Sequence, residues 1–491
     1  MGVEQFEISL IVAIYMVALM VIGFFAERRT KSVETFFLAN RSLGSWVTAI
    51  SSTAASESGW VVLGAVGLAY KDGVSALWFA PGCLFGYWIN LYWLAPRLRR
   101  EAERTGALTI PDLLAARYGD PLRLIRGIGF VVIFLSLGGY VAAQMTATGK
   151  AMEAILGVSY MQGILIGGAI IVAYTFLGGF LAVSWTDFLQ GLVMVFALAL
   201  MPILAVQAAG GYSATLGKVA AEGAGLVSIT GGKSGYALLG TLVGLFGIGL
   251  GYPGQPHVVT RYMAAQSDEK IRRSAVIAMV WGVIVFFGAG FLGLAGRVLM
   301  PRLGQPGGDP EQLFPLLSKQ MLHPLLAGVM LAAILSAIMS TVSSQLLVVA
   351  SAVSRDLLHG IFRVRQEARG AVWGARAAVL VLGVAGLLVA LSDVRVVFWF
   401  VLFAWSGLGA AFGPVLLLAL TTDKLTRAGV VAGMATGFVV TVVWKLGGLS
   451  DYVYELVPAF FLAGAAALIA SAVERRSRAG AAAAARPAAA E

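Results

Sequence analysis

The chain has 491 residues, of which 59% are hydrophobic and only 12% are charged, and its net charge is +10. Soluble proteins contain about 25% charged residues, so this composition indicates a polytopic membrane protein. The basic surplus is expected to serve membrane topology, because no basic domain with base-reading motifs indicates a nucleic-acid partner. The single cysteine, Cys83, excludes a disulfide framework and a cysteine metal site.

Thirteen segments are long and apolar enough to cross a lipid bilayer, which takes about 20 residues each. They are predicted at residues 8–26, 45–69, 74–95, 124–147, 159–182, 186–207, 234–258, 275–299, 322–352, 372–391, 396–419, 428–446 and 452–473. Most Lys and Arg residues fall in one alternate set of loops, which the positive-inside rule assigns to the cytoplasm. We therefore expect an integral inner-membrane protein with its N-terminus outside and its C-terminus in the cytoplasm.

Two of the predicted spans are interrupted at their centres or inner ends. The second carries the polar run from Ser51 to Trp60, and the seventh carries the Gly- and Pro-rich run from Gly249 to Pro256. Non-helical backbone at membrane depth is tolerated only where it is buried in protein or lines a cavity. Paired broken helices in corresponding positions of two halves are typical of secondary-transporter binding sites.

The two broken spans lie five spans apart, so they cross the membrane in opposite directions. Spans 2–6 and 7–11 are therefore expected to form a 5+5 inverted repeat within an all-α fold. This organisation predicts an extra helix and loop at 1–44, a first repeat at 45–208, an outer loop at 209–233, a second repeat at 234–419, two further helices at 420–474 and a disordered tail at 475–491.

The ninth span carries a stripe of hydroxyl side chains. Ser336, Ser340 and Ser344 recur every four residues and share one helix face, with Ala337 and Thr341 beside it. One interpretation is helix packing, with each hydroxyl bonded to a carbonyl one turn back. The other is a Na⁺ site completed by carbonyl groups that the break in span 2 leaves free.

Glu57 is the only carboxylate that this interpretation of the sequence places deep inside a span. An ionisable residue at that depth is by default a functional hypothesis. Glu57 could attract an ion, couple proton movement or contact a substrate amine. The alternatives are a structural pair with an Arg or a side chain that reaches a water-filled vestibule.

Four other residues are candidates for the same transport machinery. Tyr252 is flanked by two glycines and two prolines, and Tyr140 could line the same cavity or belong to the core. Asp187 precedes the apolar run of span 6, so it could be a helix N-cap. Arg41 is either a positive-inside residue or a partner for a carboxylate such as Asp187 at an inner gate.

Taken together, several strings resemble the sodium:solute symporter family, and within it the sodium/proline symporter branch. The strings run from Asn40 to Gly44, Ser58 to Trp60, Gly179 to Asp187, Gly251 to His257, Leu331 to Thr341 and Ala410 to Pro414. The resemblance extends from span 1 through span 12. It implies a leucine-transporter type of fold and Na⁺-coupled uptake of a small organic solute.

The resemblance also implies which residues bind the ion and the solute. The Na⁺ ligands would be backbone oxygens of Ala54, Glu57 and Ala337 and hydroxyls of Ser340 and Thr341. The substrate-binding residues would be Ser58, Gly59, Tyr140, Tyr252 and Pro256, with Ile248 facing the same pocket. Arg41 and Asp187 match polar positions that are functionally important on the cytoplasmic side.

The sequence departs from the proline branch at two positions. The branch carries an Asp where this chain has Ser56, and here a carboxylate follows one residue later, at Glu57. One residue on a helix is about 100° of rotation, so the charge cannot act from the same place. The branch also carries a Trp at the position of Ile248, so we expect one aromatic wall of the pocket to be lost.

We predict a Na⁺/solute symporter that imports a small amino acid, with L-proline as the favoured substrate and H⁺ as an alternative coupling ion. One alternative keeps the class but changes the substrate to another amino acid, a carboxylate or a sugar. Another is a transporter-like sensor that reports solute to a partner. An enzyme is not expected, because the three histidines, His257, His323 and His359, lie on different segments.

Overall fold

A computed structural model describes residues 3–364, 368–392 and 397–484, and within these ranges the chain is helical and has no β-strand. The α-helices are α1 (Val3–Glu27), α2 (Val33–Leu38), α3 (Ser45–Ser56), α4 (Ala65–Asp72), α5 (Phe79–Trp88), α6 (Ala95–Thr105), α7 (Ile110–Tyr118), α8 (Leu124–Leu156), α9 (Tyr160–Ala208), α10 (Tyr212–Glu222), α11 (Gly235–Gly247), α12 (Pro256–Met263), α13 (Asp268–Leu299), α14 (Leu313–Met321), α15 (Pro324–Ser351), α16 (Ala368–Leu391), α17 (Val397–Thr421), α18 (Arg427–Leu446) and α19 (Leu456–Ala484). Short 3-10 or π-helical segments are η1 (Ala39–Arg41), η2 (Trp60–Gly64), η3 (Gly73–Trp78), η4 (Ile89–Leu94), η5 (Ala224–Val227), η6 (Ile248–Gly254), η7 (Pro301–Gly304), η8 (Pro310–Gln312), η9 (Ala352–Ile361) and η10 (Leu449–Asp451).

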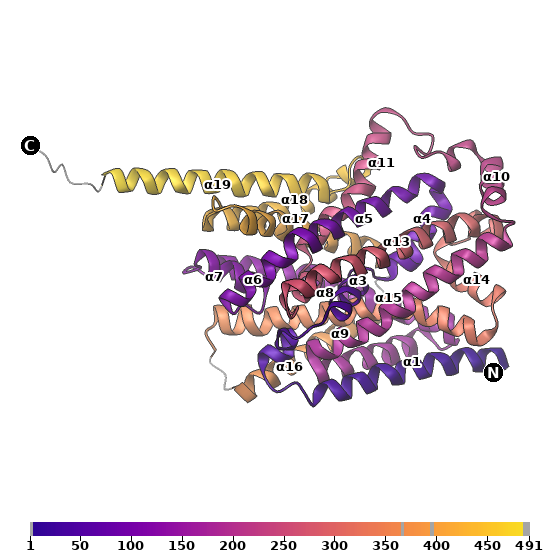
Figure 1. Ribbon diagram of the computed structural model, residues 1–491, viewed down its shortest axis with the longest axis horizontal. Coiled ribbons are helices and arrows are strands. Elements are labelled where there is room, and N and C mark those ends of the chain that lie inside the picture. Colours follow the sequence, from indigo (N-terminus) through magenta and orange to yellow (C-terminus); the bar gives the residue numbers. More distant parts are fainter. Residues whose placement is uncertain (1–2, 365–367, 393–396, 485–491) are drawn as a thin grey trace, which may run out of the picture.

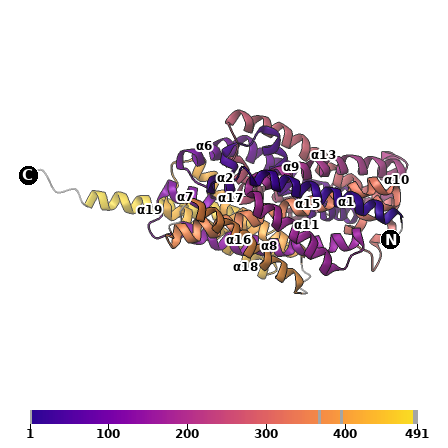
Figure 2. The same cartoon turned by 90° about the horizontal axis from the view of Figure 1, so that it is seen from below.

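The long helices lie roughly parallel in one bundle, so the bundle has two ends (Figures 1 and 2). The N-terminus, α10 and α14 lie at one end, and we call this the α14 end. The short helices α6 and α7 lie at the other, where α19 projects beyond the body of the molecule; this is the α7 end. The two chain ends thus lie at opposite ends of the bundle, as an odd number of crossings requires.

The described residues contain eleven helical runs long and apolar enough to cross a membrane, but two of them are far too long for one crossing. The 49 residues of α9 would extend about 74 Å, against about 30 Å of hydrocarbon. The run turns back at Gly179, whose φ of 54° only glycine adopts readily. Beside α1, Gly178 lies against Ala26, whereas Gln190 has returned to hydrogen-bond Tyr15.

The second long run extends for 46 residues from η2 through α6 and turns back at Gly73, with φ 68°. Helix α13 lies alongside both arms. Near its end Arg297 donates to the carbonyl of Tyr70, and farther back Gly282 lies against Tyr87. With these two turns counted, the eleven runs give the thirteen crossings that hydropathy predicts.

Both predicted interruptions are present. Helix α3 ends at Ser56, and Glu57 leaves the helical region with φ −98° and ψ 84° before η2 begins. In the seventh span α11 gives way to the 3-10 segment η6, and Gln255 is extended before α12 starts. The segment η6 packs between α5 and α17, while α3 packs against α9, α13 and α15.

The C-terminal segment differs from the sequence-based expectation. Disorder was expected from residue 475, but α19 continues as a helix to Ala484. Alanine has the highest helix propensity of all residues, so an alanine-rich tail readily extends a preceding helix. Residues 485–491 lie outside the described part of the chain, as does residue 396, the first of the predicted eleventh span.

Candidate substrate and sodium site

The two helix breaks meet at a small cavity of about 30 Å³ near the middle of the bundle, which is roughly the space of one water molecule. Five elements surround it: α3, η2, α8, η6 and α17. The lining residues are Ser56, Glu57, Ser58, Trp60, Tyr140, Ile248, Tyr252 and Trp405. Four of the six predicted substrate residues are therefore brought together here.

The other two predicted substrate residues lie elsewhere. Gly59 directly follows Ser58, but it lines a second, larger cavity on the α14 side of the small one. Pro256 is buried at the start of α12, where its carbonyl accepts a hydrogen bond from Thr260 at 2.5 Å. Pro256 follows the extended residue Gln255 and is not among the residues that line the small cavity.

Glu57 is 2% exposed and presents its carboxylate to the cavity. One oxygen, Oε1, accepts hydrogen bonds from the hydroxyls of Tyr252 at 2.5 Å, Tyr87 at 3.0 Å and Ser56 at 3.1 Å. Among the described residues, none donates to Oε2 and none forms a salt bridge with Glu57. The structural alternative of a pair with an Arg is therefore not what the described residues show.

Ser58 and Tyr140 connect the break in α3 to helix α8. The Tyr140 hydroxyl donates to Ser58 Oγ at 3.1 Å, and the same oxygen accepts the backbone N–H of Trp60 at 3.2 Å. Ser58 thus satisfies a backbone group that the break leaves without a helical partner. Its side chain holds the broken segment against α8.

Trp405, on α17, is a cavity residue that the sequence analysis missed. Its ring packs edge-to-face on Tyr252 with centroids 4.9 Å apart, and its Nε1 donates to the carbonyl of Ile248 at 3.2 Å. Trp405 thus adds an aromatic ring to the cavity lining from another helix, next to Ile248. No local motif marks Trp405 in the sequence, because it is one tryptophan in an apolar span.

Four of the five oxygens predicted to bind Na⁺, those of Ala54, Ala337, Ser340 and Thr341, lie close together where α3 meets α15. Ser340 Oγ lies 2.9 Å from the carbonyl of Ala54, and Thr341 Oγ1 lies 3.2 Å from that of Ala55. Both hydroxyls also lie within hydrogen-bonding distance of the carbonyl of Ala337, at 3.3 and 3.1 Å. The carbonyl oxygen of Ala55 is a further candidate ion ligand, which was not predicted from the sequence.

This oxygen set has the chemistry of a site for a hard monovalent cation. Its members are neutral carbonyl and hydroxyl oxygens, and all are buried. The described residues contain no group of three or more His, Cys, Asp or Glu that could hold a transition metal. Not every hydroxyl of the stripe lies at this oxygen set. The hydroxyl of Ser336 instead donates to the hydroxyl of Tyr15 at 3.1 Å.

Asp187 corrects two expectations. It lies inside α9, well beyond the turn at Gly179, so it is not a helix N-cap. Its partner is Arg261 rather than Arg41, and both side chains of the pair are at most 1% exposed. Glu57 is therefore not the only carboxylate buried within a span.

Two hydroxyl groups surround the Asp187–Arg261 pair. Arg261 donates to Ser51 Oγ at 2.6 Å and to Ser344 Oγ at 2.5 Å, and both hydroxyls also bond Asp187. The pair thereby joins α3, α9, α12 and α15 on the α7 side of the ion site. The sequence analysis counted Arg261 only as a loop charge, because its position at the end of a span gave no other signal.

Arg41 lies nearer the α7 end. Its guanidinium donates to three backbone carbonyls, those of Met263, Ala102 and Ala107, at 3.0 to 3.1 Å. Burial among these groups lowers the pKa of Arg41 from its ordinary value, and the neighbouring Glu34, 3.4 Å away, acts in the opposite sense. Arg41 therefore ties the first loop to the ends of α6 and α12.

A larger cavity of about 570 Å³ lies on the α14 side of the small one. Trp60 lines both cavities, so it stands between them. Charged residues at the rim are Lys150, Glu153, Asp309, Glu311 and Lys319. Burial, aided by Asp309, raises the pKa of Glu311. We call this cavity the vestibule.

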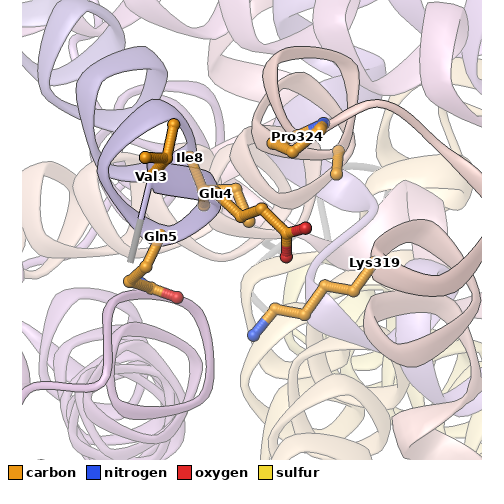
Figure 3. Close-up of a pocket in the computed structure, with 7 residues that line it drawn as sticks. Val3, Glu4, Gln5, Ile8, Lys319 and Pro324 are labelled. Carbon is orange, nitrogen blue, oxygen red and sulfur yellow. The ribbon is translucent and has the colours of Figure 1, made fainter. Parts of the chain in front are cut away.

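A separate pocket of about 470 Å³ lies beside the start of α1 and is lined by none of the predicted site residues. Glu4 and Lys319 point into the same space there, with Pro324 on the opposite side (Figure 3). Because Lys319 also lines the vestibule, the two spaces are neighbours at the α14 end.

Comparison with known proteins gives both a family and a fold. The model of the sodium:solute symporter family matches residues 36–437. The high-affinity proline transporter PutP of Bacillus subtilis (strain 168) is 39% identical over 443 residues, which are 90% of this chain and 93% of the relative. The sodium/proline symporter of Escherichia coli (strain K12) is 37% identical and covers 91% and 89% of the two chains.

Solved structures agree on the architecture. A Na⁺-coupled sialic acid symporter in a substrate-bound outward-open state superposes with a TM-score of 0.81 at 19% identity, over 96% of this chain and 98% of that one. Mhp1, a nucleobase-cation-symport-1 family transporter, gives 0.56 at 17% identity over 89% and 95%. These likenesses establish the leucine-transporter type of fold.

Proposed function

Because this chain belongs to the sodium:solute symporter family, and is therefore a secondary transporter and not an enzyme, we propose that it imports L-proline together with Na⁺. One observation carries the proposal: a buried set of neutral oxygens at the α3–α15 junction adjoins a cavity formed by the two helix breaks. Relatives named as proline transporters are 37–39% identical over about nine-tenths of the chain. Both the set of neutral oxygens and the membership of the sodium:solute symporter family support Na⁺ as the coupling ion.

In the proposed mechanism, Na⁺ binds carbonyls of Ala54, Glu57 and Ala337 and the hydroxyls of Ser340 and Thr341. Binding fixes the end of α3 against α15, and Ser58 and Glu57 lie directly after that end. A substrate that needs the same ordered segment then binds more tightly. By linkage, substrate must strengthen Na⁺ binding by the same factor.

Two closures would alternate during transport. Trp60 separates the small cavity from the vestibule, so it is the group that we assign to the outer closure. The Asp187–Arg261 pair and the Arg41 contacts, which join α3, α9, α12 and α15, are assigned to the inner closure. Opening inward must break these polar contacts, and water entering from the cytoplasm then compensates the freed groups.

We place the α14 end outside and the α7 end in the cytoplasm. The basic residues that favour this assignment gather around α6, α7 and the loop before α3. We also propose the two repeats at 45–208 and 234–419 as the functional halves, since each opens with one of the two broken helices.

Uptake into proteoliposomes tests the proposed function. Radiolabelled proline should accumulate when an inward Na⁺ gradient is imposed and should equilibrate only passively when K⁺ replaces Na⁺. Accumulation driven by a proton gradient alone would reassign the coupling ion to H⁺. If proline shows no uptake but another solute gives Na⁺-dependent thermal stabilisation, the transporter class stands and proline is rejected.

A further inference from the structure

Glu57 carries the one carboxyl group among the residues that line the small cavity. None of the other seven lining residues is ionised at neutral pH, and no described Lys, Arg or His forms a salt bridge with it. Leaving a buried carboxylate without a cation is expensive, especially at membrane depth. An ionised Glu57 would therefore be stabilised by a cationic group that a ligand brings into the cavity.

The hydrogen bonds orient Glu57 in one specific way. The hydroxyls of Tyr252, Tyr87 and Ser56 all converge on Oε1. The other oxygen, Oε2, accepts no hydrogen bond from the described residues, although a carboxylate oxygen can accept two. Oε2 is therefore the oxygen of Glu57 that remains available to a ligand in the cavity.

The remaining walls suit a compact cation as well. The rings of Tyr140, Tyr252 and Trp405 line the cavity, and aromatic faces attract ammonium groups by their quadrupole. Ile248 and Trp60 add apolar surface for a hydrocarbon ring or chain. The lining thus combines one carboxyl group with apolar and aromatic side chains. It contains no cationic side chain that would favour a ligand with several acidic groups.

We propose that Oε2 of Glu57 binds the cationic nitrogen of the substrate, and that this contact makes the transporter selective for amino-acid-like solutes with a protonated amine. The inference rests on the proposed function and names its specificity determinant. Glu57 is also the residue directly after the end of α3, and the carbonyls of Ala54 and Ala55 belong to the last turn of that helix. One short segment therefore holds both the substrate nitrogen and the ion, which provides direct coupling between the two sites.

The test compares two ring compounds of nearly the same shape. L-proline carries a protonated ring nitrogen, whereas tetrahydrofuran-2-carboxylate has an oxygen at that position. Competition against labelled proline uptake and thermal stabilisation in Na⁺ measure both compounds on the full-length protein. The wild type should prefer proline by about 100-fold or more, and in Glu57→Gln the preference should fall to within about threefold, because a charge-assisted hydrogen bond is lost.

Controls separate this role from damage to the fold or the ion site. Glu57→Gln should keep Na⁺-dependent stabilisation without substrate, since only its backbone carbonyl is assigned to Na⁺. Glu57→Asp retains the charge and should recover part of the preference. Glu269→Gln, an exposed carboxylate near the α7 end, should leave the preference as in the wild type.

The outcomes distinguish this inference from the proposed function. If Glu57→Gln keeps the full preference for proline, the amine contact is rejected while proline transport stands. A change confined to the pH dependence of uptake would also reject it and would make Glu57 a proton site. If proline does not bind but other amines outcompete their uncharged analogues through Glu57, the substrate assignment fails and the inference holds.

Discussion

At the scale of single residues, the site separates neutral oxygens from charge. The proposed ion site consists of backbone carbonyls and the hydroxyls of Ser340 and Thr341, whereas Glu57 lines the neighbouring cavity. A monovalent ion needs less compensating charge than a divalent one, so neutral oxygens can replace its hydration shell. The charge of Glu57 is then left available for another partner.

Thr341→Ala is expected to raise the Na⁺ concentration for half-maximal uptake about tenfold, equivalent to about 1.4 kcal/mol of binding free energy. The substitution removes one hydroxyl that lies beside the carbonyls of Ala55 and Ala337. Thr441→Ala is the matched control, because Thr441 makes the same bond to the carbonyl one turn back, but in α18. Unchanged Na⁺ dependence in Thr341→Ala would remove this residue from the ion site.

At the scale of elements, turns and breaks position the polar groups. The turn at Gly179 lets α9 return along α1 and α3, which carries Asp187 into the bundle. Restarting the helix at Pro256 makes α12 a separate short element, and Arg261 projects from it toward Asp187. The pair therefore joins one element from each proposed repeat.

Asp187→Asn and Arg261→Gln are each expected to destabilise the protein by about 3–5 kcal/mol, because each leaves a buried charge without its partner. The double variant should lose clearly less than the sum of the two, since neither charge remains. Melting temperatures in detergent measure all three proteins. Additive losses would show that the two groups do not interact in the folded state.

An exposed pair provides the matched control for this cycle. Glu269 and Arg273 are both 65% exposed, and they are joined at 2.6 Å along α13. The same amide substitutions there should change the melting temperature little, because water solvates either charge alone. A comparable loss at both pairs would indicate a general effect of charge removal.

At the scale of the whole molecule, the two ends of the bundle differ in access. The vestibule at the α14 end has about 570 Å³ and reaches Trp60. Between the proposed ion site and the α7 end lie the buried Asp187–Arg261 pair and the hydrogen bonds of Arg41. With the α14 end placed outside, as proposed, this arrangement would be an outward-facing one in which Trp60 separates the vestibule from the small cavity.

Cysteine labelling tests this asymmetry on a Cys83→Ser background, which removes the single native thiol. Ala147→Cys lines the vestibule and should react with a membrane-impermeant maleimide in the presence of Na⁺. Val258→Cys is buried in α12 and should stay unreactive from either side under the same conditions. Rapid labelling of Val258→Cys with Na⁺ present would show that the inner side is open.

The sequence by itself determined the class, the crossings and the two breaks. Hydropathy identifies spans because the transfer of apolar residues into lipid is a local property. The breaks were visible because Gly, Pro and polar residues inside a span cannot satisfy the backbone as a helix does. The resemblance predicted which oxygens bind Na⁺; those of Ala54, Ala337, Ser340 and Thr341 lie together at the junction of α3 and α15, and their role as ion ligands stays a prediction.

Only the tertiary structure decided which side chains meet. Asp187 pairs with Arg261 rather than Arg41, Trp405 lines the small cavity beside Ile248, and Pro256 is not among the lining residues. These contacts join residues far apart in the chain, and they depend on how each helix is rotated and packed. Hydropathy and spacing specify where a helix lies in the membrane, but the identity of its neighbours is set by packing throughout the bundle.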